Sequence, residues 1–266
     1  MPQTRQIVVP LSKGLGQLEA LPQPVVTYGR ELAQGETLPF HRHRRAQLVY
    51  ASSGVMTVTT RSATYVVPPQ RAVWMPGGVD HCIEARNAVA MRTLYVEPGA
   101  AAELPTEVRV LQVAPLLREL IVTAVAAGPG YEPDSPQSRV MSVILDQIPA
   151  QPVASLALPM PTDSRVLRVA QSLIANPGDS RDLGEWASTV GASKRTLSRL
   201  FTEQTRMSFQ AWRQQRRLLR ALELLATGKN VTSIALELGY DNTSAFIAMF
   251  RRCLGTTPAR YLNTTN

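Results

Sequence analysis

The chain has 266 residues, two cysteines and a formal net charge of +8. This length favours two domains, each large enough to bury its own core without a disulfide framework or a structural metal. The N-terminal residues MPQTRQIVVP lack a signal-peptide pattern, and no apolar run is long enough to span a membrane, so we expect a cytoplasmic protein. Cys82 and Cys253 are far apart in the sequence and are expected to be core thiols.

The front of the chain, from Val25 to about Val96, contains short β-rich runs separated by turn residues. These runs are VVTYGRE, AQLVYAS, VMTVTT, ATYVV, RAVWM and VAMRTLYV. Short strands at this spacing predict an antiparallel sandwich or barrel, which we assign to residues 1–105.

Two helices are predicted next, within residues 106–150. Helical spacing places the first between Val108 and Ala127 and the second between Ser138 and Ile148. The apolar stripe of the first consists of Leu111, Leu116, Leu117, Leu120, Ile121 and Ala124. We interpret this hairpin as a dimerisation element. The stretch QPVASLALPMPTD contains three prolines and predicts a linker over residues 151–162.

The rest of the chain, residues 163–266, is predicted to be helical. A first helix begins at the N-cap Ser164, with Val166, Leu167, Val169, Ala170, Leu173 and Ile174 on its buried face, and ends at the Asn-Pro-Gly of residues 176–178. A short helix over Leu183–Val190, a turn at Gly191 and an N-cap at Ser193 follow the punctuation of a helix-turn-helix unit.

This helix-turn-helix pattern occurs twice. Ala187 and Gly191 in the first copy correspond to Ala235 and Gly239 in the second, where alanine permits close packing and glycine suits a tight turn. The core pair that follows is Leu197 and Phe201 in the first copy and Phe246 and Phe250 in the second. One helix from Ser208 to Ala226 connects the copies and directs Trp212, Leu218, Leu219, Leu222 and Leu225 inward.

The basic charge is concentrated in the helical region. From Asp163 to Asn266 there are fifteen Lys or Arg against eight Asp or Glu, whereas the rest of the chain has thirteen against twelve. A small, strongly basic domain is typical of binding to a polyanion, because each neutralised phosphate releases condensed counterions. A solvated basic face without a partner is the alternative interpretation.

The second copy and its tail, GYDNTSAFIAMFRRCLGTTPARYL, resemble the signature of the AraC/XylS transcription regulators. The residues at the expected spacing are Gly239, Tyr240, Ser244, Phe246, Phe250, Gly255, Thr257, Pro258 and Tyr261. The resemblance covers about Ser164 to Leu262. It implies a homodimer that binds double-stranded DNA, works with RNA polymerase and is not an enzyme. One departure is Ala248, which stands where the family often has arginine.

The recognition helices supply the candidate DNA contacts. In the first they are Ser193, Lys194, Arg195, Thr196, Ser198 and Arg199, and in the second Asn242, Thr243, Ser244 and Ile247. We expect Arg195 to contact a guanine, Lys194 and Arg199 to contact phosphates, and Ile247 to touch a thymine methyl. The connecting-helix residues Arg213, Arg216, Arg217 and Arg220 are interpreted as a solvated face.

All three histidines of the chain lie in the β-rich region. The spacing of Gly35, His41, His43, Gln47 and Gly54 resembles the first cupin motif, with Gln47 in place of the usual glutamate. Pro76, Gly78 and His81 resemble the core of the second motif, whose leading glycine and closing asparagine are replaced by Gln70 and Ala85.

The histidine spacing indicates a candidate metal site. Residues two apart on a strand share a face, so His41 and His43 should point together into the barrel while Arg42 and Cys82 point away. With His81 and the Gln47 amide oxygen they could hold a divalent transition metal such as zinc, nickel, iron or manganese. The alternative is that these histidines bond the backbone or a ligand without metal.

Together these patterns predict an α+β protein of two domains. The first is a cupin-like antiparallel β-barrel with its helical hairpin, and the second is an all-α double helix-turn-helix domain over 163–266. The predicted function is sequence-specific transcription regulation in response to a small-molecule effector. Two alternatives stay open, namely constitutive DNA binding with the barrel as a dimerisation scaffold, and a metal-dependent cupin enzyme with a DNA-binding tail.

Overall fold

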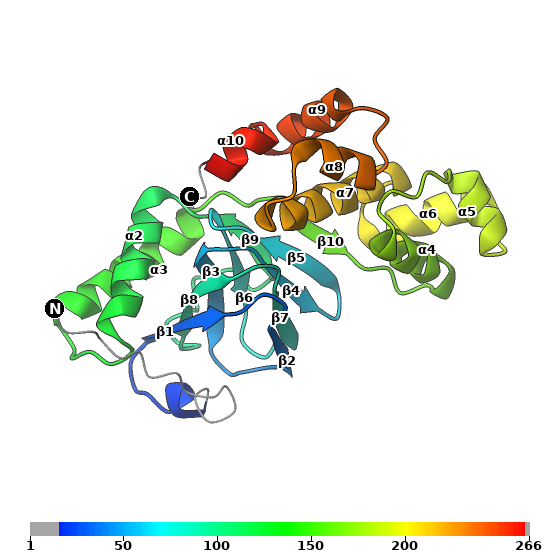
Figure 1. The fold of residues 1–266 in the computed structure, drawn as a ribbon. Coiled ribbons are helices and arrows are strands. Elements are labelled where there is room, and N and C mark those ends of the chain that lie inside the picture. The colour runs from blue at the N-terminus through cyan, green and yellow to red at the C-terminus, as the bar shows by residue number, and fades with distance from the viewer. Residues whose placement is uncertain (1–15, 264–266) are drawn as a thin grey trace. The chain divides into compact units, whose positions relative to one another are not determined.

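The computed structural model describes residues 16–263 (Figure 1). The N-terminal run MPQTRQIVVP lies outside this range. The chain divides into two compact units, one formed by Met1–Gly54 and Val67–Ala154 and the other by Val55–Val66 and Ser155–Asn266. Within residues 16–263, no helix has the length and apolarity that a membrane span requires.

The first unit is built on an antiparallel sheet with strand order β1-β8-β3-β6-β9. Its strands are β1 (Val25–Leu32), β3 (Ala46–Ser53), β6 (Arg71–Met75), β8 (Val89–Val96) and β9 (Arg109–Gln112). A further antiparallel pair consists of β2 (Thr37–His41) and β7 (His81–Ala85). The predicted antiparallel architecture is confirmed, and β2, β7 and β9 add strands that the β-rich runs did not include.

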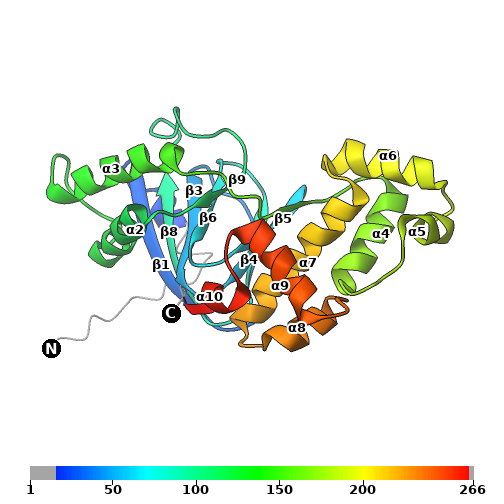
Figure 2. The same ribbon diagram turned by 90° about the horizontal axis from the view of Figure 1, so that it is seen from above.

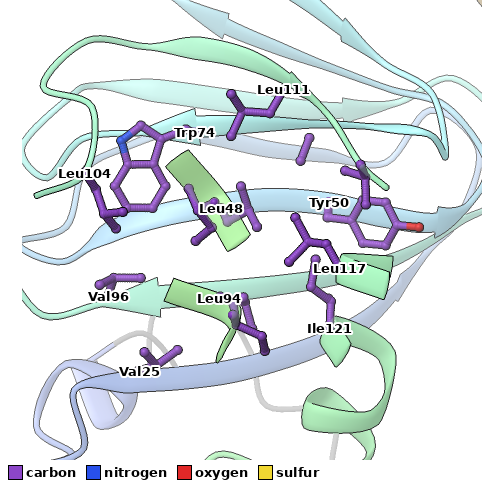
Figure 3. Close-up of a cluster of buried hydrophobic side chains, with 14 of the residues drawn as sticks. Val25, Leu48, Tyr50, Trp74, Leu94, Val96, Leu104, Leu111, Leu117 and Ile121 are labelled. Carbon is purple, nitrogen blue, oxygen red and sulfur yellow. The ribbon is translucent and has the colours of Figure 1, made fainter. Parts of the chain in front are cut away.

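Two helices of the first unit, α2 (Pro115–Ala127) and α3 (Pro136–Ala150), share one apolar core with the sheet. Figure 3 shows Leu48 and Leu94 of the sheet beside Leu117 and Ile121 of α2, and all four side chains are fully buried. The predicted start of the first helix near Val108 is wrong. Residues 109–112 pair with β6 as a strand, and the helix begins only at Pro115, whose fixed φ suits the first helical position.

The second unit contains seven helices among its described residues, together with short strands. The helices are α4 (Ser164–Ala175), α5 (Leu183–Thr189), α6 (Lys194–Thr205), α7 (Phe209–Ala226), α8 (Val231–Glu237), α9 (Thr243–Leu254) and α10 (Pro258–Asn263). The strands that belong to this part are β4 (Met56–Thr60), β5 (Ala63–Val67) and β10 (Ala157–Pro159). In Figure 2, α7 runs between the group α4–α6 and the group α8–α10.

The segment predicted as a linker contains β10, which pairs antiparallel with β5. This segment is also bonded to the connecting helix α7. The Trp212 indole Nε1 donates to the Pro159 carbonyl over 2.7 Å, and the Gln215 amide donates to the carbonyls of Ser155 and Ala157. Residues 155–159 are therefore part of the packed helical unit.

The N-caps of the helical unit can be compared with those predicted from the sequence. Ser193 caps α6 as predicted by accepting the Thr196 N–H. Ser208, which was predicted as the first residue of the connecting helix, is instead its N-cap and accepts the Ala211 N–H. The predicted N-cap Ser164 is wrong by one residue, because the Asp163 side chain accepts the N–H of Arg165 and Ser164 is already helical. Hydrogen bonds from the Arg165 guanidinium and then from the Arg165 backbone N–H lower the pKa of Asp163 to about 2.

The internal repeat is confirmed at its turns. Ala192 N–H donates to the Ala187 carbonyl over 2.9 Å, and Tyr240 N–H donates to the Ala235 carbonyl over 3.0 Å. Gly191 and Gly239 both adopt positive φ, +68° and +72°, which glycine tolerates without steric cost. The copies differ in packing. A Cβ added to Gly239 would lie 2.5 Å from the Gly178 carbonyl oxygen, whereas one added to Gly191 meets nothing within 4 Å.

Candidate functional site

The three histidines converge at one point of the first unit. One ring nitrogen from each of His41, His43 and His81 lies within 4.8 Å of the others. His43 and His81 are buried and His41 is partly exposed. The strand argument for this convergence is only partly correct. β2 ends at His41, and His43 lies in the irregular segment before β3 rather than on the same strand.

Each imidazole is oriented by a backbone carbonyl. The Nδ1 atoms of His41, His43 and His81 lie 2.8, 2.6 and 2.9 Å from the carbonyl oxygens of Pro39, Arg45 and Val79. A carbonyl only accepts, so each Nδ1 carries the hydrogen. In a neutral ring this leaves a lone pair on Nε2, which is the form that ligates a metal.

Gln47 of β3 presents its amide oxygen to two of these rings. Oε1 lies 3.0 Å from the His43 Nε2 and 3.1 Å from the His81 Nε2. The orientation of the amide follows from β8, where Thr93 Oγ1 donates to the Leu48 carbonyl. Because this hydroxyl hydrogen is already used, Thr93 accepts from the Gln47 Nε2, which also lies 3.2 Å from the Tyr95 hydroxyl.

The resulting cluster has an excess of acceptors. Burial lowers the pKa of His43, and it lowers the pKa of His81 to about 4, so both rings are neutral near pH 7. Two Nε2 lone pairs and the Gln47 Oε1 then face one another without a hydrogen between them. A cation bound by all three removes this conflict. The alternative is a reversed Gln47 amide that donates to both rings, which requires the Thr93 hydroxyl to leave the Leu48 carbonyl.

Three residues around this cluster were not predicted. Thr93 and Tyr95 are two apart on β8 and therefore share the face that holds Gln47. Arg45 is fully buried, its carbonyl accepts from His43, and its guanidinium donates to the carbonyls of Leu21 and Gln23. The alternation of side chains along the VAMRTLYV strand could have indicated that Thr93 and Tyr95 share one face. No sequence pattern indicated that Arg45, which lies in a loop, would be buried beside the cluster.

The first recognition helix, α6, carries most of its predicted contacts on an exposed face. Lys194, Arg195, Ser198 and Arg199 are exposed, and Thr196 is partly buried. Among the described residues Arg195 makes no ion pair, whereas Arg199 pairs with Glu203 one turn away. Ser193 uses its hydroxyl to cap the helix at Thr196, so it positions the helix start.

The second recognition helix, α9, has a smaller polar face. Asn242 is its N-cap, with Oδ1 accepting from the Ala245 N–H over 2.8 Å. Ser244 is exposed, Thr243 and Ile247 are partly buried, and Ser244 and Ile247 border a shallow hollow together with Ala248 and Arg251.

The expectation of core thiols is wrong for Cys253, which is exposed on α9, and Cys82 is only partly buried on β7. Cys82 does follow His81 on the strand and so points to the opposite face, as predicted. Neither sulfur belongs to the histidine cluster found among the described residues.

Comparison with known proteins identifies both units. Residues 23–158 match the family described as AraC-like ligand binding domain, and residues 186–264 match a helix-turn-helix domain. The HTH-type transcriptional regulator NimR of Escherichia coli strain K12 is 38% identical over 226 residues, which cover 85% of this chain and 82% of that protein. RipA of Corynebacterium glutamicum, also named an HTH-type transcriptional regulator, is 36% identical over 132 residues, or 50% of this chain and 37% of RipA.

Among solved structures, ToxT from Vibrio cholerae aligns over 91% of this chain and 98% of its own, with 10% identity and a TM-score of 0.39. The predicted fold class is confirmed by the family matches, as a cupin-like antiparallel β domain followed by a helical helix-turn-helix domain. The protein is accordingly a DNA-binding transcription regulator with an effector-binding N-terminal domain, and it belongs to the AraC family.

Proposed function

We propose that this regulator senses its effector through a divalent transition metal held by His41, His43, His81 and Gln47. The observation that carries the proposal is the Gln47 Oε1, which lies 3.0 and 3.1 Å from two imidazole nitrogens that carry no hydrogen when the rings are neutral and Nδ1 is protonated. Three imidazoles and one amide oxygen suit zinc, nickel or iron better than calcium or magnesium, which prefer oxygen ligands.

The surrounding residues support this role by fixing the ligands. Carbonyls of Pro39, Arg45 and Val79 hold the three rings, and Thr93 holds the Gln47 amide. Such outer contacts set ligand orientation and tautomer. A bound metal would supply an electron-pair acceptor for an oxygen or nitrogen atom of the effector.

The same site disfavours the enzyme alternative. A metal-dependent cupin enzyme needs a base beside the metal, and the position of the usual motif glutamate is occupied here by Gln47. The side chains that hydrogen-bond to Gln47 are His43, His81, Thr93 and Tyr95, and none of them is a carboxylate. The function that we propose is therefore regulation without catalytic activity.

The dimerisation role of the α2–α3 hairpin is also part of this proposal. Leu116 of α2 and Val143 of α3 are 56% and 40% exposed, and a second hairpin packed on them would remove this apolar surface from water. In this arrangement a homodimer binds DNA in the cytoplasm and alters how RNA polymerase uses the promoter.

Elemental mass spectrometry of the purified full chain tests the metal site. We expect near one transition-metal ion per chain, lost in His43→Ala. Thr93→Val keeps every ligand but releases the Gln47 amide, so it should weaken metal affinity about 10- to 100-fold. Gln47→Glu adds a negative ligand and should strengthen it. Cys82→Ala, next to His81 but on the opposite face, is the control and should bind metal normally.

Operator affinity measured with and without a chelator then connects the metal to sensing. A folded protein would contradict the proposal if it contains no metal, takes up no zinc, nickel, iron or manganese, and binds DNA with the same affinity with and without the chelator. That result would favour the reversed Gln47 amide and a metal-free effector site.

A further inference from the structure

A strongly basic cavity of about 500 Å³ lies between α7 and α9 of the helical unit. Arg213 and Arg217 line it from α7 and Arg252 from α9, with Tyr240 at its wall. No Asp or Glu is among the described residues that line it. Three guanidinium groups therefore line this cavity, and no carboxylate among the described residues lines it with them.

The cavity exists because α9 presents small side chains to it. Ala245 and Ala248 line it and are both exposed. Arginine, which often occurs in the family at the position of Ala248, would occupy part of this space. Here the positive charge comes from the connecting helix instead.

The arrangement of Arg213 and Arg217 is unfavourable without a ligand. They are one turn apart on α7, and like charges at this spacing destabilise a helix. Burial, followed by the charge of Arg217, lowers the pKa of Arg213. Neither they nor Arg252 form an ion pair with the carboxylates of residues 16–263. Arg220, further along the same helix, pairs with both Glu223 and Glu237.

Neutral acceptors hold these guanidinium groups in place. Arg213 donates to the Arg181 carbonyl over 2.9 Å, Arg217 donates to the Pro177 carbonyl over 3.0 Å, and Arg252 donates to the Gln214 amide oxygen over 3.2 Å. The Arg217 guanidinium also lies 5.2 Å from the centre of the Tyr240 ring. The charges of Asp179 and Asp182 also act on Arg213, but neither carboxylate forms an ion pair with it or lines the cavity. The three guanidinium groups are therefore oriented by neutral acceptors and keep their charge toward the cavity.

We propose that this cavity binds a phosphate group, and that the sugar–phosphate backbone of the operator supplies it. Guanidinium groups match phosphate oxygens in geometry and charge. Ala248 lines both this cavity and the hollow beside Ser244, Ile247 and Arg251 on the predicted DNA face of α9. A DNA strand that follows that face passes the mouth of the cavity. Arg213 and Arg217 then contact phosphate, whereas the sequence suggested a solvated face.

The test uses the full chain and an operator duplex selected from random sequences by binding to it. One phosphate at a time is replaced by an uncharged methylphosphonate, and the affinity of each duplex is measured. For the wild type, one replacement should weaken binding about 10-fold, the scale of a charge-assisted hydrogen bond. In Arg217→Gln and Arg213→Gln the penalty at that phosphate should fall below about 2-fold while penalties elsewhere remain.

Two further variants keep the result interpretable if a cavity arginine proves necessary for folding. Arg252→Gln removes an exposed side chain held only by Gln214 among the bonds described, so it should fold normally and show the same loss. Arg220→Gln, on the same helix but already ion-paired, should keep the wild-type penalty. The slope of log affinity against log salt should fall by about 1 for Arg252→Gln.

Calorimetric titration of the DNA-free chain with pyrophosphate separates the two sources of phosphate. Pyrophosphate binding that disappears in Arg252→Gln, without any change in the methylphosphonate pattern, supports the cavity as a phosphate site but assigns it to a free ligand. Identical methylphosphonate penalties in all variants, together with no pyrophosphate binding, would overturn the proposal.

Discussion

Replacing the turn glycine of each helix-turn-helix copy by alanine should have unequal costs. Both Gly191 and Gly239 have positive φ, so either substitution incurs the left-handed penalty of about 1–2 kcal/mol. Only at Gly239 does the new methyl meet backbone, 2.5 Å from the Gly178 oxygen. Overpacking of this kind adds about 1–3 kcal/mol. We therefore expect Gly191→Ala to lower the free energy of unfolding by about 1–2 kcal/mol and Gly239→Ala by about 2–5 kcal/mol.

Urea denaturation followed by tryptophan fluorescence measures this difference. Trp186 and Trp212 are buried in the helical unit, so a Trp74→Phe background restricts the signal to that unit. Gly191→Asn is a useful companion, because asparagine tolerates the left-handed region better than alanine and should lose less stability. Equal losses for the two alanine variants would refute the argument, since they would show that the contact between Gly178 and Gly239 relaxes at no cost.

Two further predictions concern assembly and pH. In sedimentation experiments, Leu116→Asp should convert the full chain to a monomer. The control Leu236→Asp, at a 66% exposed leucine on α8, should leave the dimer intact. If both variants are dimers, the hairpin is not the dimerisation element. Hydrogen bonds from the N–H groups of Glu185 and Gly184 lower the pKa of Asp182 in the folded state. The Asp182 carboxylate therefore stabilises the fold above its unfolded pKa of about 3.9, and this contribution is lost as the pH falls through its folded pKa. Asp182→Asn keeps the cap at neutral pH but should make stability less sensitive to acid below about pH 4 in urea titrations, and an unchanged acid profile would contradict this.

The sequence predicted the helical unit well because its signals are local. Glycine turns, serine caps and apolar spacing each act within a few residues, and all appear in the structure where expected except the caps at Asp163 and Ser208. The front domain depended on longer-range effects. Leu111 matched a helical stripe, but pairing with β6 placed it on a strand. Strand spacing alone would not bring His43 to its partners, since the chain leaves β2 at His41.

The candidate sites likewise combine features that were predictable from local sequence with features that depend on long-range packing. The ligand types and their spacing indicated the histidine cluster, but the excess of acceptors depends on Thr93, which fixes the Gln47 amide from a strand more than forty residues away. The basic cavity was not predicted, because the sequence places Arg217 and Arg252 far apart and only the packing of α9 on α7 brings them together.

The bonds from Trp212 and Gln215 to residues 155–159 have a consequence for anyone who exchanges domains between relatives of this protein. A chimaera joined at Asp163 would give the helical domain a foreign segment in place of Pro159, whose carbonyl accepts the Trp212 indole N–H. A joint placed before Ser155 transfers these acceptors together with the helix that uses them. A chimaera should therefore keep the proline-rich stretch of residues 155–159 together with the DNA-binding domain.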